Sequence, residues 1–191
     1  MAILAYNEIT QKKVIEYNGE PYEVLSSHVF RMQQRKPVNQ TKLRHLVSGK
    51  VLEISFHQNE NASEAEIGHI EAKYLYTNRG ESWFAEEGNP KNRFSFPEDA
   101  VHDKVQWLIP NATVEVMTYK DEPATIEIPI KIELKVTEAP PAVRGDTATG
   151  GDKRVTLESG ASVTTPLFIN EGDVLRINTE TGEYVERVSK S

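Results

Sequence analysis

The stretch Val14-Ile15-Glu16-Tyr17-Asn18-Gly19-Glu20-Pro21-Tyr22-Glu23-Val24-Leu25 decides the fold class of this chain. Two runs rich in β-branched and aromatic residues flank Asn18-Gly19. This dipeptide is preferred in a type I′ turn, because both central residues of that turn need a positive φ. The stretch therefore predicts a β-hairpin with a two-residue turn.

The same pattern recurs along the chain, where short apolar runs flank a turn signal. The predicted pairs are residues 43–47 and 51–56 around Ser48-Gly49, 73–77 and 81–85 around Asn78-Arg79-Gly80, 113–119 and 125–128 around Lys120-Asp121, and 175–177 and 184–186 around Thr181-Gly182. Short strands separated by frequent turns are typical of small β-barrels and sandwiches. We therefore expect an all-β protein.

A single helix is predicted between residues 88 and 111. Pro97-Glu98-Asp99 suits a first helical turn, because acids are favoured at the positive end of a helix. Val101, Val105 and Leu108 then follow at helical spacing.

Four aromatic residues before this helix alternate as half-buried strand residues do: Trp83, Phe84, Phe94 and Phe96. This alternation favours core packing over base stacking.

The composition excludes several classes of protein. The chain has 191 residues, 38% hydrophobic and 27% charged, which is ordinary for a globular protein. It has no cysteine, which excludes a disulfide scaffold, a zinc–thiolate site, an iron–sulfur cluster and a thiol nucleophile. Its apolar runs fall short of the roughly 20 residues that a spanning helix needs, and its first residues lack a signal-peptide pattern. We expect a cytoplasmic protein without a membrane partner.

The charge is distributed unevenly. The total is −7, but residues 1–57 hold 8 basic and 5 acidic side chains (+3), residues 58–130 hold 6 and 14 (−8), and residues 131–191 hold 8 and 10 (−2). The stretch between Glu23 and Glu53 has no carboxylate and contains these cations: Arg31, Arg35, Lys36, Lys42, Arg44 and Lys50. Such a segment is suited to meet phosphates. A solvated basic strand face is the alternative.

Two strand-like arms within residues 28–43 enclose Met32-Gln33-Gln34-Arg35-Lys36-Pro37. Long polar and cationic side chains have no packing role at a hairpin tip, and loops of this kind often carry function. An edge hairpin that Lys, Arg and Pro protect against strand pairing is the alternative. From the residues alone, both interpretations stay open.

The residues give no support to catalysis or metal binding. Gly145 and Gly150 have the spacing of a phosphate-binding loop, but Gly151-Asp152 stands where Lys and Ser or Thr are required. A flexible turn and a contact loop both remain possible there. The five histidines have no metal-binding spacing, and no Gly-x-Ser-x-Gly motif occurs. We expect no enzyme, no bound metal and no cofactor.

Two stretches suggest domain boundaries. Residues 57–64 have the composition of a connector, and a second boundary is placed near residues 129–131. We predict three domains, at 1–64, 65–130 and 131–191. Because each domain is small, contacts between neighbours are expected to add stability.

Several longer motifs follow one another in order. They are Tyr17 to Val24, His28-Val29, Thr41-Lys42-Leu43, Gly49-Lys50-Val51, Tyr74-Leu75-Tyr76, and residues 145–151, 153–173 and 179–185. Together they resemble the bacterial translation elongation factor P family over essentially the whole chain. Small departures occur at Val155, where Ala is usual, and at Thr165, where Val is usual.

The resemblance implies three small β-barrels, an N-terminal SH3-like (KOW-type) domain followed by two OB-fold domains, in a tRNA-like L shape. It implies a monomeric factor, not an enzyme, that contacts both ribosomal subunits between the peptidyl-tRNA and exit sites. There it would position the peptidyl-tRNA and stimulate peptide-bond formation, relieving stalling at consecutive prolines. A general single-strand RNA-binding OB-fold protein without a ribosomal role is the alternative. A hydrolase has no nucleophile–base spacing to support it.

The family's hairpin tip carries one Lys or Arg, often modified, that reaches the tRNA acceptor end. Counting forward from His28 places this position at Gln33, and counting back from Thr41 places it at Gln34, because the loop is one residue longer here. Neither residue is a cation. We assign the tip role to Arg35 and expect no modification, since a guanidinium binds phosphate directly.

The resemblance gives three sets of site residues. The tip contact with the tRNA acceptor end comprises Gln33, Gln34, Arg35 and Lys36, with Lys36 as the alternative cation. Residues expected to face tRNA or rRNA are Arg31, Lys42 and Arg44. A loop expected to meet the mRNA codon in the exit site, near the small subunit, comprises Gly145, Asp146 and Thr147.

Overall fold

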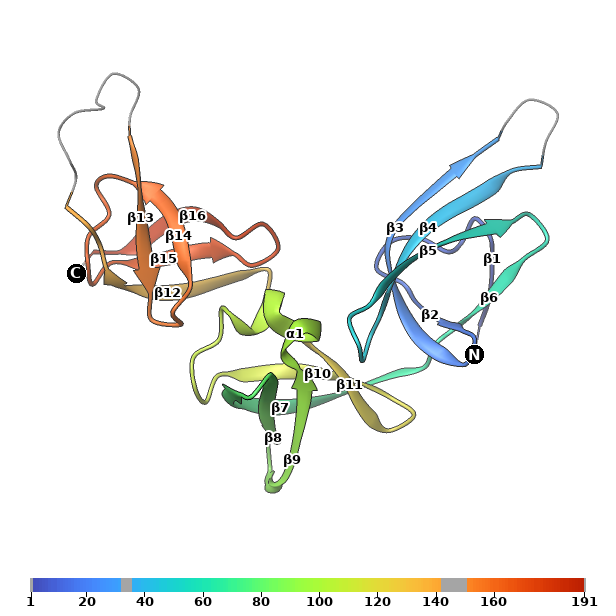
Figure 1. The fold of residues 1–191 in the computed structure, drawn as a ribbon, viewed down its shortest axis with the longest axis horizontal. Helices are drawn as coiled ribbons and strands as arrows, with labels where there is room; N and C mark the ends of the chain where they lie inside the picture. The colour runs from blue at the N-terminus through green and yellow to red at the C-terminus, as the bar shows by residue number, and fades with distance from the viewer. Residues whose placement is uncertain (1, 32–35, 142–150, 191) are drawn as a thin grey trace. The chain divides into compact units, whose positions relative to one another are not determined.

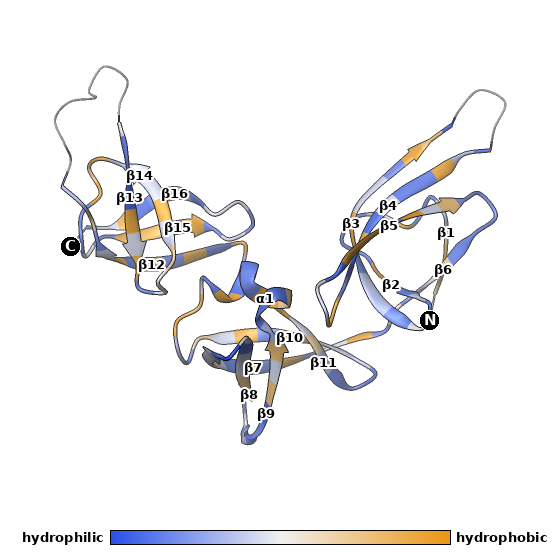
Figure 2. Cartoon of the chain, viewed as in Figure 1, coloured by the Kyte–Doolittle hydropathy of each residue, from blue (hydrophilic) through white to orange (hydrophobic). Residues whose placement is uncertain are grey.

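The computed structural model describes residues 2–31, 36–141 and 151–190. These residues form three β-sheets and one helix, α1 (Figure 1). Apolar and polar bands alternate along the strands, as expected where one face of a sheet meets a core and the other meets water (Figure 2). The prediction of an all-β protein is confirmed.

The first sheet has six strands in the order β1-β6-β2-β3-β4-β5. They are β1 (Ile3–Ala5), β2 (Val14–Tyr17), β3 (Glu20–Phe30), β4 (Val38–His45), β5 (Val51–His57) and β6 (Asn61–Glu64). Its buried core consists of Leu4, Ile9, Ile15, Tyr22, Val24, Leu43, Phe56 and Ala62. Full burial of one large apolar side chain contributes roughly 1.5–3 kcal/mol to stability. Because this core includes side chains of β3 and β4, it stabilises the base of the long hairpin that these two strands form.

The predicted Asn-Gly hairpin is confirmed. β2 and β3 are joined at Asn18 and Gly19, whose φ values of 52° and 83° are both positive, as a type I′ turn requires. The short turn fixes the register of the two strands. As a result Ile15 and Tyr22 lie opposite each other and both enter the core.

The prediction that residues 57–64 form a connector is wrong for residues 61–64. Asn61–Glu64 forms strand β6, which pairs with both β1 and β2. Strand pairing uses backbone groups, so polar side chains do not prevent it. The buried residue of β6 is Ala62, 6% exposed, and one alanine gives too weak an apolar pattern to be recognised in the sequence.

The second sheet has five strands in the order β11-β10-β7-β8-β9. They are β7 (Ile67–Asn78), β8 (Glu81–Glu86), β9 (Asn89–Pro97), β10 (Thr113–Tyr119) and β11 (Glu122–Glu127), with α1 (Glu98–Val105) between β9 and β10. The predicted helix is confirmed, although it ends before Leu108. The turns at Arg79-Gly80 and Lys120-Asp121 have positive φ at both residues, so these predicted hairpins are also confirmed.

The third sheet has the order β14-β13-β12-β15-β16. Its strands are β12 (Lys131–Glu138), β13 (Asp152–Leu157), β14 (Ser162–Pro166), β15 (Val174–Asn178) and β16 (Glu183–Ser189). The second and third sheets therefore share one strand order, 5-4-1-2-3 counted within each sheet, and β14 also contacts β16. This is the connectivity of the five-stranded OB barrel, which agrees with the expected fold.

Contacts divide the chain into two units, Met1–Val101 with Thr113–Ile126, and His102–Ala112 with Glu127–Ser191. Trp107, in the segment after α1, is buried in the core of the third sheet with Leu134, Val155 and Ile177. The division into domains at 1–64, 65–130 and 131–191, and the L shape, stay predictions.

Candidate nucleic-acid interface

The predicted basic segment lies on the hairpin of β3 and β4. β3 has 11 residues and β4 has 8, and their pairing continues to Phe30 opposite Val38. β5 pairs along the other side of β4, up to His57 opposite Val38. The two strand-like arms expected within residues 28–43 are therefore confirmed, and β5 extends the hairpin to a three-stranded segment of the sheet.

The two faces of this hairpin differ in character. Along β4, Asn39, Thr41 and Leu43 are buried, whereas Gln40 and Lys42 are exposed. Leu25 is an extra residue between paired positions of β3, a bulge that changes which β3 side chains face outward. The outward face is consequently polar, and its central residues are Ser26, His28, Gln40, Lys42, Glu53 and Ser55.

Asn39 anchors the hairpin to the N-terminal segment. Its side chain is fully buried, and Nδ2 donates to the carbonyl oxygens of Tyr6 at 2.6 Å and Ile9 at 2.9 Å. Because buried carbonyls without partners are costly, this amide fixes the path of residues 6–9 under the hairpin. Sequence reasoning missed Asn39, although a polar residue at an inward position of an alternating strand is a recognisable signal.

Arg44, predicted to face RNA, forms an ion pair with Glu23 on β3. The distance from Nη2 to Oε2 is 3.0 Å, and both side chains are about a quarter exposed, 25% and 28%. Glu53 on β5 lies directly opposite Lys42. The segment between Glu23 and Glu53 contains no carboxylate, but strand pairing places these two glutamates beside its cations Arg44 and Lys42.

Two further cations lie nearer the hairpin end, where Arg31 and Lys36 are both exposed. Lys36 Nζ lies 3.4 Å from Asn59 Oδ1, in the turn after β5. His28 and Phe30 stack on β3, with ring centroids 6.2 Å apart and planes 18° apart. The predicted tip residues Gln33, Gln34 and Arg35 lie outside the described residues.

The outward face of the hairpin is hollowed only slightly. A depression of about 160 Å³ is lined by Ser26, His28, Gln40, Thr41, Lys42 and Glu53. Pockets for small organic ligands usually enclose about 300–1,000 Å³. The surface is therefore better suited to a macromolecule than to a small substrate.

A buried tyrosine lies at the base of the hairpin. Burial raises the pKa of Tyr22, and the Glu20 carboxylate, 3.4 Å from its hydroxyl, raises that pKa further. His45 packs edge-on against the ring at 5.0 Å, and its Nε2 lies 3.4 Å from Glu20. The neutral phenol is thus the form that the folded state favours.

The predicted mRNA loop, Gly145, Asp146 and Thr147, lies outside the described residues. Its neighbours are placed, since β12 ends at Glu138 and β13 begins at Asp152. The loop therefore connects the first two strands of an OB sheet, a connection that often contributes to oligonucleotide binding in this fold.

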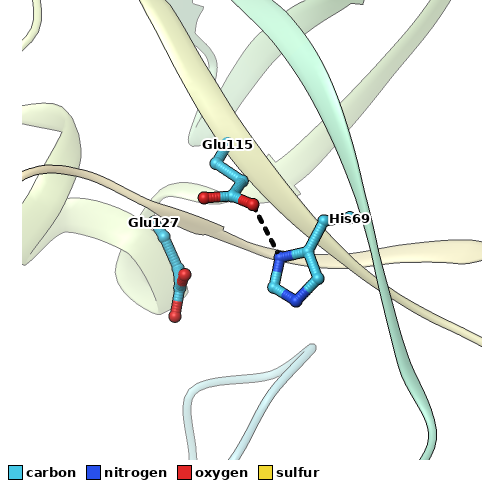
Figure 3. Close-up of side chains that lie close together, drawn as sticks. All are labelled: His69, Glu115 and Glu127. Carbon is cyan, nitrogen blue, oxygen red and sulfur yellow. Dashed lines mark ion pairs between the residues drawn. The ribbon is translucent and has the colours of Figure 1, made fainter.

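One histidine of the second sheet meets a carboxylate. His69 Nδ1 on β7 lies 3.0 Å from Glu115 Oε1 on β10, as Figure 3 shows together with Glu127, the last residue of β11. All three side chains are exposed, and exposed acidic groups often gather without an ion. We assign no metal site to them.

No helix in the described part of the chain is both long and apolar enough to cross a lipid bilayer.

Comparisons with known proteins agree along the chain. Residues 6–62 match the elongation factor P (EF-P) KOW-like domain, and residues 132–187 match the elongation factor P C-terminal domain. A relative named elongation factor P from Thermodesulfovibrio yellowstonii is 38% identical over 188 residues, which is 98% of this chain and 100% of the relative. One of the same name from Moorella thermoacetica is 36% identical over 185 residues, or 97% and 100%.

Among solved structures, the eukaryotic translation initiation factor 5A from Methanococcus jannaschii aligns with a TM-score of 0.47 and 10% identity. The alignment covers 66% of this chain and 94% of that chain.

A KOW-like sheet followed by two OB sheets defines a protein built from small β-barrels. Relatives of this identity over nearly the whole length make the assignment specific. The chain belongs to the elongation factor P family and is a translation elongation factor.

Proposed function

We propose that this factor binds the ribosome between the peptidyl-tRNA and exit sites, positions the peptidyl-tRNA, and stimulates peptide-bond formation at consecutive prolines. The observation that carries the proposal is the long β3–β4 hairpin of this chain, which belongs to the elongation factor P family. β3 and β4 stay paired to Phe30 and Val38, well past the last of their residues in the buried core, Val24 and Leu43. A long hairpin that carries exposed cations such as Arg31 and Lys42 is suited to contact RNA.

The proposed contribution to the reaction is geometric. Holding two reacting groups in a productive orientation lowers the entropic part of the barrier without new acid–base chemistry. Proline has a fixed φ and a constrained ring nitrogen, so it gains most from such positioning. This mechanism needs no catalytic side chain on the factor.

The tip residues Gln33, Gln34, Arg35 and Lys36 would meet the tRNA acceptor end, with Arg35 as the main phosphate contact. Further down the hairpin, Arg31, Lys42 and Arg44 would face tRNA or rRNA. The ion pair between Arg44 and Glu23 gives Arg44 the smaller share, because its charge is partly compensated already. Exposed Lys42 and Arg31 carry the larger share.

The second contact proposed is with the small subunit, where the loop of Gly145, Asp146 and Thr147 would approach the mRNA codon in the exit site. The factor would act in the cytoplasm as a monomer of three domains, at 1–64, 65–130 and 131–191, that contacts both ribosomal subunits. The loop lies in the connection between β12 and β13, the first two strands of an OB sheet, and connections at this place contribute to oligonucleotide binding in that fold.

The test is translation in a purified system of two reporters, one with a Pro-Pro-Pro motif and one without proline runs. The factor is expected to raise full-length Pro-Pro-Pro product and to leave the proline-free product unchanged. Arg35→Ala and Lys36→Ala should reduce the stimulation, whereas Lys131→Ala, which removes an exposed cation of β12, should not. Equal effects on both reporters would contradict the proposal, and full activity of both tip variants would refute the tip assignment.

The absence of a tip modification is tested separately by the intact mass of the protein purified from its own cells. A mass equal to that of the sequence is expected. A mass increased by a sugar or an amino-acid adduct would overturn this part of the proposal.

A further inference from the structure

An irregularity in β7 turns one tyrosine away from the core of the second sheet. In a regular strand, residues two apart face the same side, so Tyr74 and Tyr76 would point together. β7 instead has an extra residue at Leu75, since Tyr74 pairs with Phe84 and Tyr76 pairs with Trp83. Tyr74 is consequently buried at 8% exposure, whereas Tyr76 is 47% exposed. Bulges that re-aim one side chain are frequent next to functional sites.

Trp83 shares the outward face with Tyr76. On β8, its neighbours Ser82 and Phe84 are fully buried, so Trp83 lies on the opposite side of the strand and is half-buried. The core position predicted for Phe84 and Phe96 is confirmed, but Trp83 is not one of the buried core residues. Two aromatic rings therefore face outward from directly opposite positions on neighbouring strands.

Cations flank this pair on the same face. Lys73 on β7 and Arg93 on β9 lie on either side of Ala85, one row from Trp83. Lys73 pairs with Glu87 at 3.5 Å, but both side chains are well exposed, 45% and 39%, and surface pairs of this kind are weak. Arg93 is exposed and has no ion-pair partner among the residues that the structure describes.

The third sheet provides an internal comparison, because it has the same strand order. Its β13 and β14 occupy the places of β8 and β9, and their outward residues are Arg154, Thr156, Ser162 and Thr164. None of these is aromatic. β12, the counterpart of β7, has no aromatic residue either, so the outward tyrosine and tryptophan are not required by the OB topology.

We propose that the outward face of β7, β8 and β9 is a binding site for single-stranded RNA, in which Tyr76 and Trp83 stack on unpaired bases and Lys73 and Arg93 meet the adjoining phosphates. The face of strands two and three of an OB sheet, here β8 and β9, usually binds oligonucleotides, and aromatic stacking tolerates any base. The cations distinguish this ligand from an apolar peptide, since a peptide groove would have no use for them. The site is separate from the hairpin tip and does not depend on its role.

The test uses the full-length protein and a fluorescently labelled single-stranded RNA of about eight nucleotides, with affinity measured by anisotropy at low salt. Tyr76→Ala and Trp83→Leu are each expected to weaken binding about tenfold. Lys73→Ala and Arg93→Ala should each reduce the slope of log affinity against log salt concentration by about one, which corresponds to the loss of one phosphate contact.

Two controls make the result specific. Phe168→Ala removes an aromatic that is 55% exposed and has Arg187 over its ring at 5.1 Å, so it matches the chemistry at another place. Lys131→Ala removes an exposed cation of β12 that belongs to neither proposed site. Both should bind the RNA as the unaltered protein does, and duplex RNA should compete poorly.

Several results would overturn the proposal. They are no binding of single-stranded RNA by the unaltered protein, Tyr76→Ala binding within about twofold of it, or an equal loss with Phe168→Ala. If Trp83→Leu fails to fold, Tyr76→Ala alone decides, because its side chain is half in solvent.

Discussion

The hydroxyl of Tyr119 donates a hydrogen bond of 2.6 Å to the Glu16 carboxylate and thereby links β10 of the second sheet to β2 of the first. The two residues are 103 positions apart, and both are partly buried. Lys120 lies over the Tyr119 ring at 4.6 Å, and its hydrogen bond with Tyr119 raises the pKa of the ammonium group. One side-chain contact thus joins two sheets within one contact unit.

Tyr119→Phe removes the hydroxyl and keeps the ring. We expect a loss of about 1–2 kcal/mol in the free energy of unfolding, because a hydrogen bond to a charged acceptor is lost and the carboxylate is already partly desolvated. Urea unfolding of Tyr119→Phe, Glu16→Gln and the double variant measures the coupling between the two residues. Additive effects in this cycle would show that the hydrogen bond does not connect the sheets energetically.

Gly49 touches helix α1 at close range. Its φ is +68°, and a Cβ atom there would lie 2.8 Å from Ala100 Cα, which is backbone and cannot yield easily. Gly49→Ala should therefore destabilise the protein by about 2–3 kcal/mol, from backbone strain and overlap together.

Gly19→Ala is the matched control, because Gly19 has a φ of +83° but open space around the Cβ position. It should show the strain alone, about 1 kcal/mol. Thermal unfolding of both variants separates the two contributions. Equal destabilisation would mean that Gly49 does not need to approach α1 closely.

Asn39→Ala removes the amide that serves the carbonyls of Tyr6 and Ile9. Both carbonyls lose a buried donor, so we expect a loss of about 2–3 kcal/mol. Gln40→Ala, at the adjacent exposed position, should change stability by less than about 0.5 kcal/mol. Denaturant melts of the two variants test this, and an Asn39→Ala midpoint equal to that of the unaltered protein would contradict it.

Glu23→Gln should release the charge of Arg44 on the hairpin. If Arg44 faces RNA as proposed, the variant should bind ribosomes about threefold more tightly at low salt, and the gain should vanish at high salt. Glu133→Gln is the control, because it removes one of the two carboxylates that pair with Arg176 on the third sheet, at 2.8 Å, while Glu186 remains. Ribosome pelleting at two salt concentrations measures both. A gain of equal size with Glu133→Gln would show a general charge effect.

Tyr22 should make the stability of the fold depend on alkaline pH. Burial raises its pKa in the folded state above the value of about 10 in the unfolded chain. The unfolded state therefore loses its proton first, so stability is complete below about pH 10 and falls as the pH rises further. Tyr22→Phe should show a shallower decline than the unaltered protein when unfolding is followed from pH 9 to pH 11. Parallel curves would rule out this contribution.

The sequence predicted the hairpins best, and the reason is local. Asn18-Gly19 and Lys120-Asp121 have positive φ at both turn residues, and the choice of such residues depends on the turn itself. The strand β6 escaped detection because its pairing depends on β1 and β2, which are far from it in sequence. Backbone pairing across such distances leaves little trace in a polar segment.

The candidate site was predicted as a set of cations, and in the structure one of them forms an ion pair. Lys42, Arg44 and the hairpin arms were recognised from the sequence, but the partnership of Arg44 with Glu23 was not. The outward turn of Tyr76 was missed for a related reason. A single inserted residue, Leu75, reverses the side that the later residues face, and a period of two cannot reveal that shift.

The burial of Trp107 in the core of the third sheet has a consequence for the order in which the protein folds during synthesis. Residues 102–112 leave the ribosome before residues 127–191, yet both belong to one contact unit. During synthesis the indole therefore emerges before Leu134, Val155 and Ile177, which share its core. The third sheet closes on a side chain that was synthesised before its first strand, so this part of the factor can complete its core only after β15 has been made.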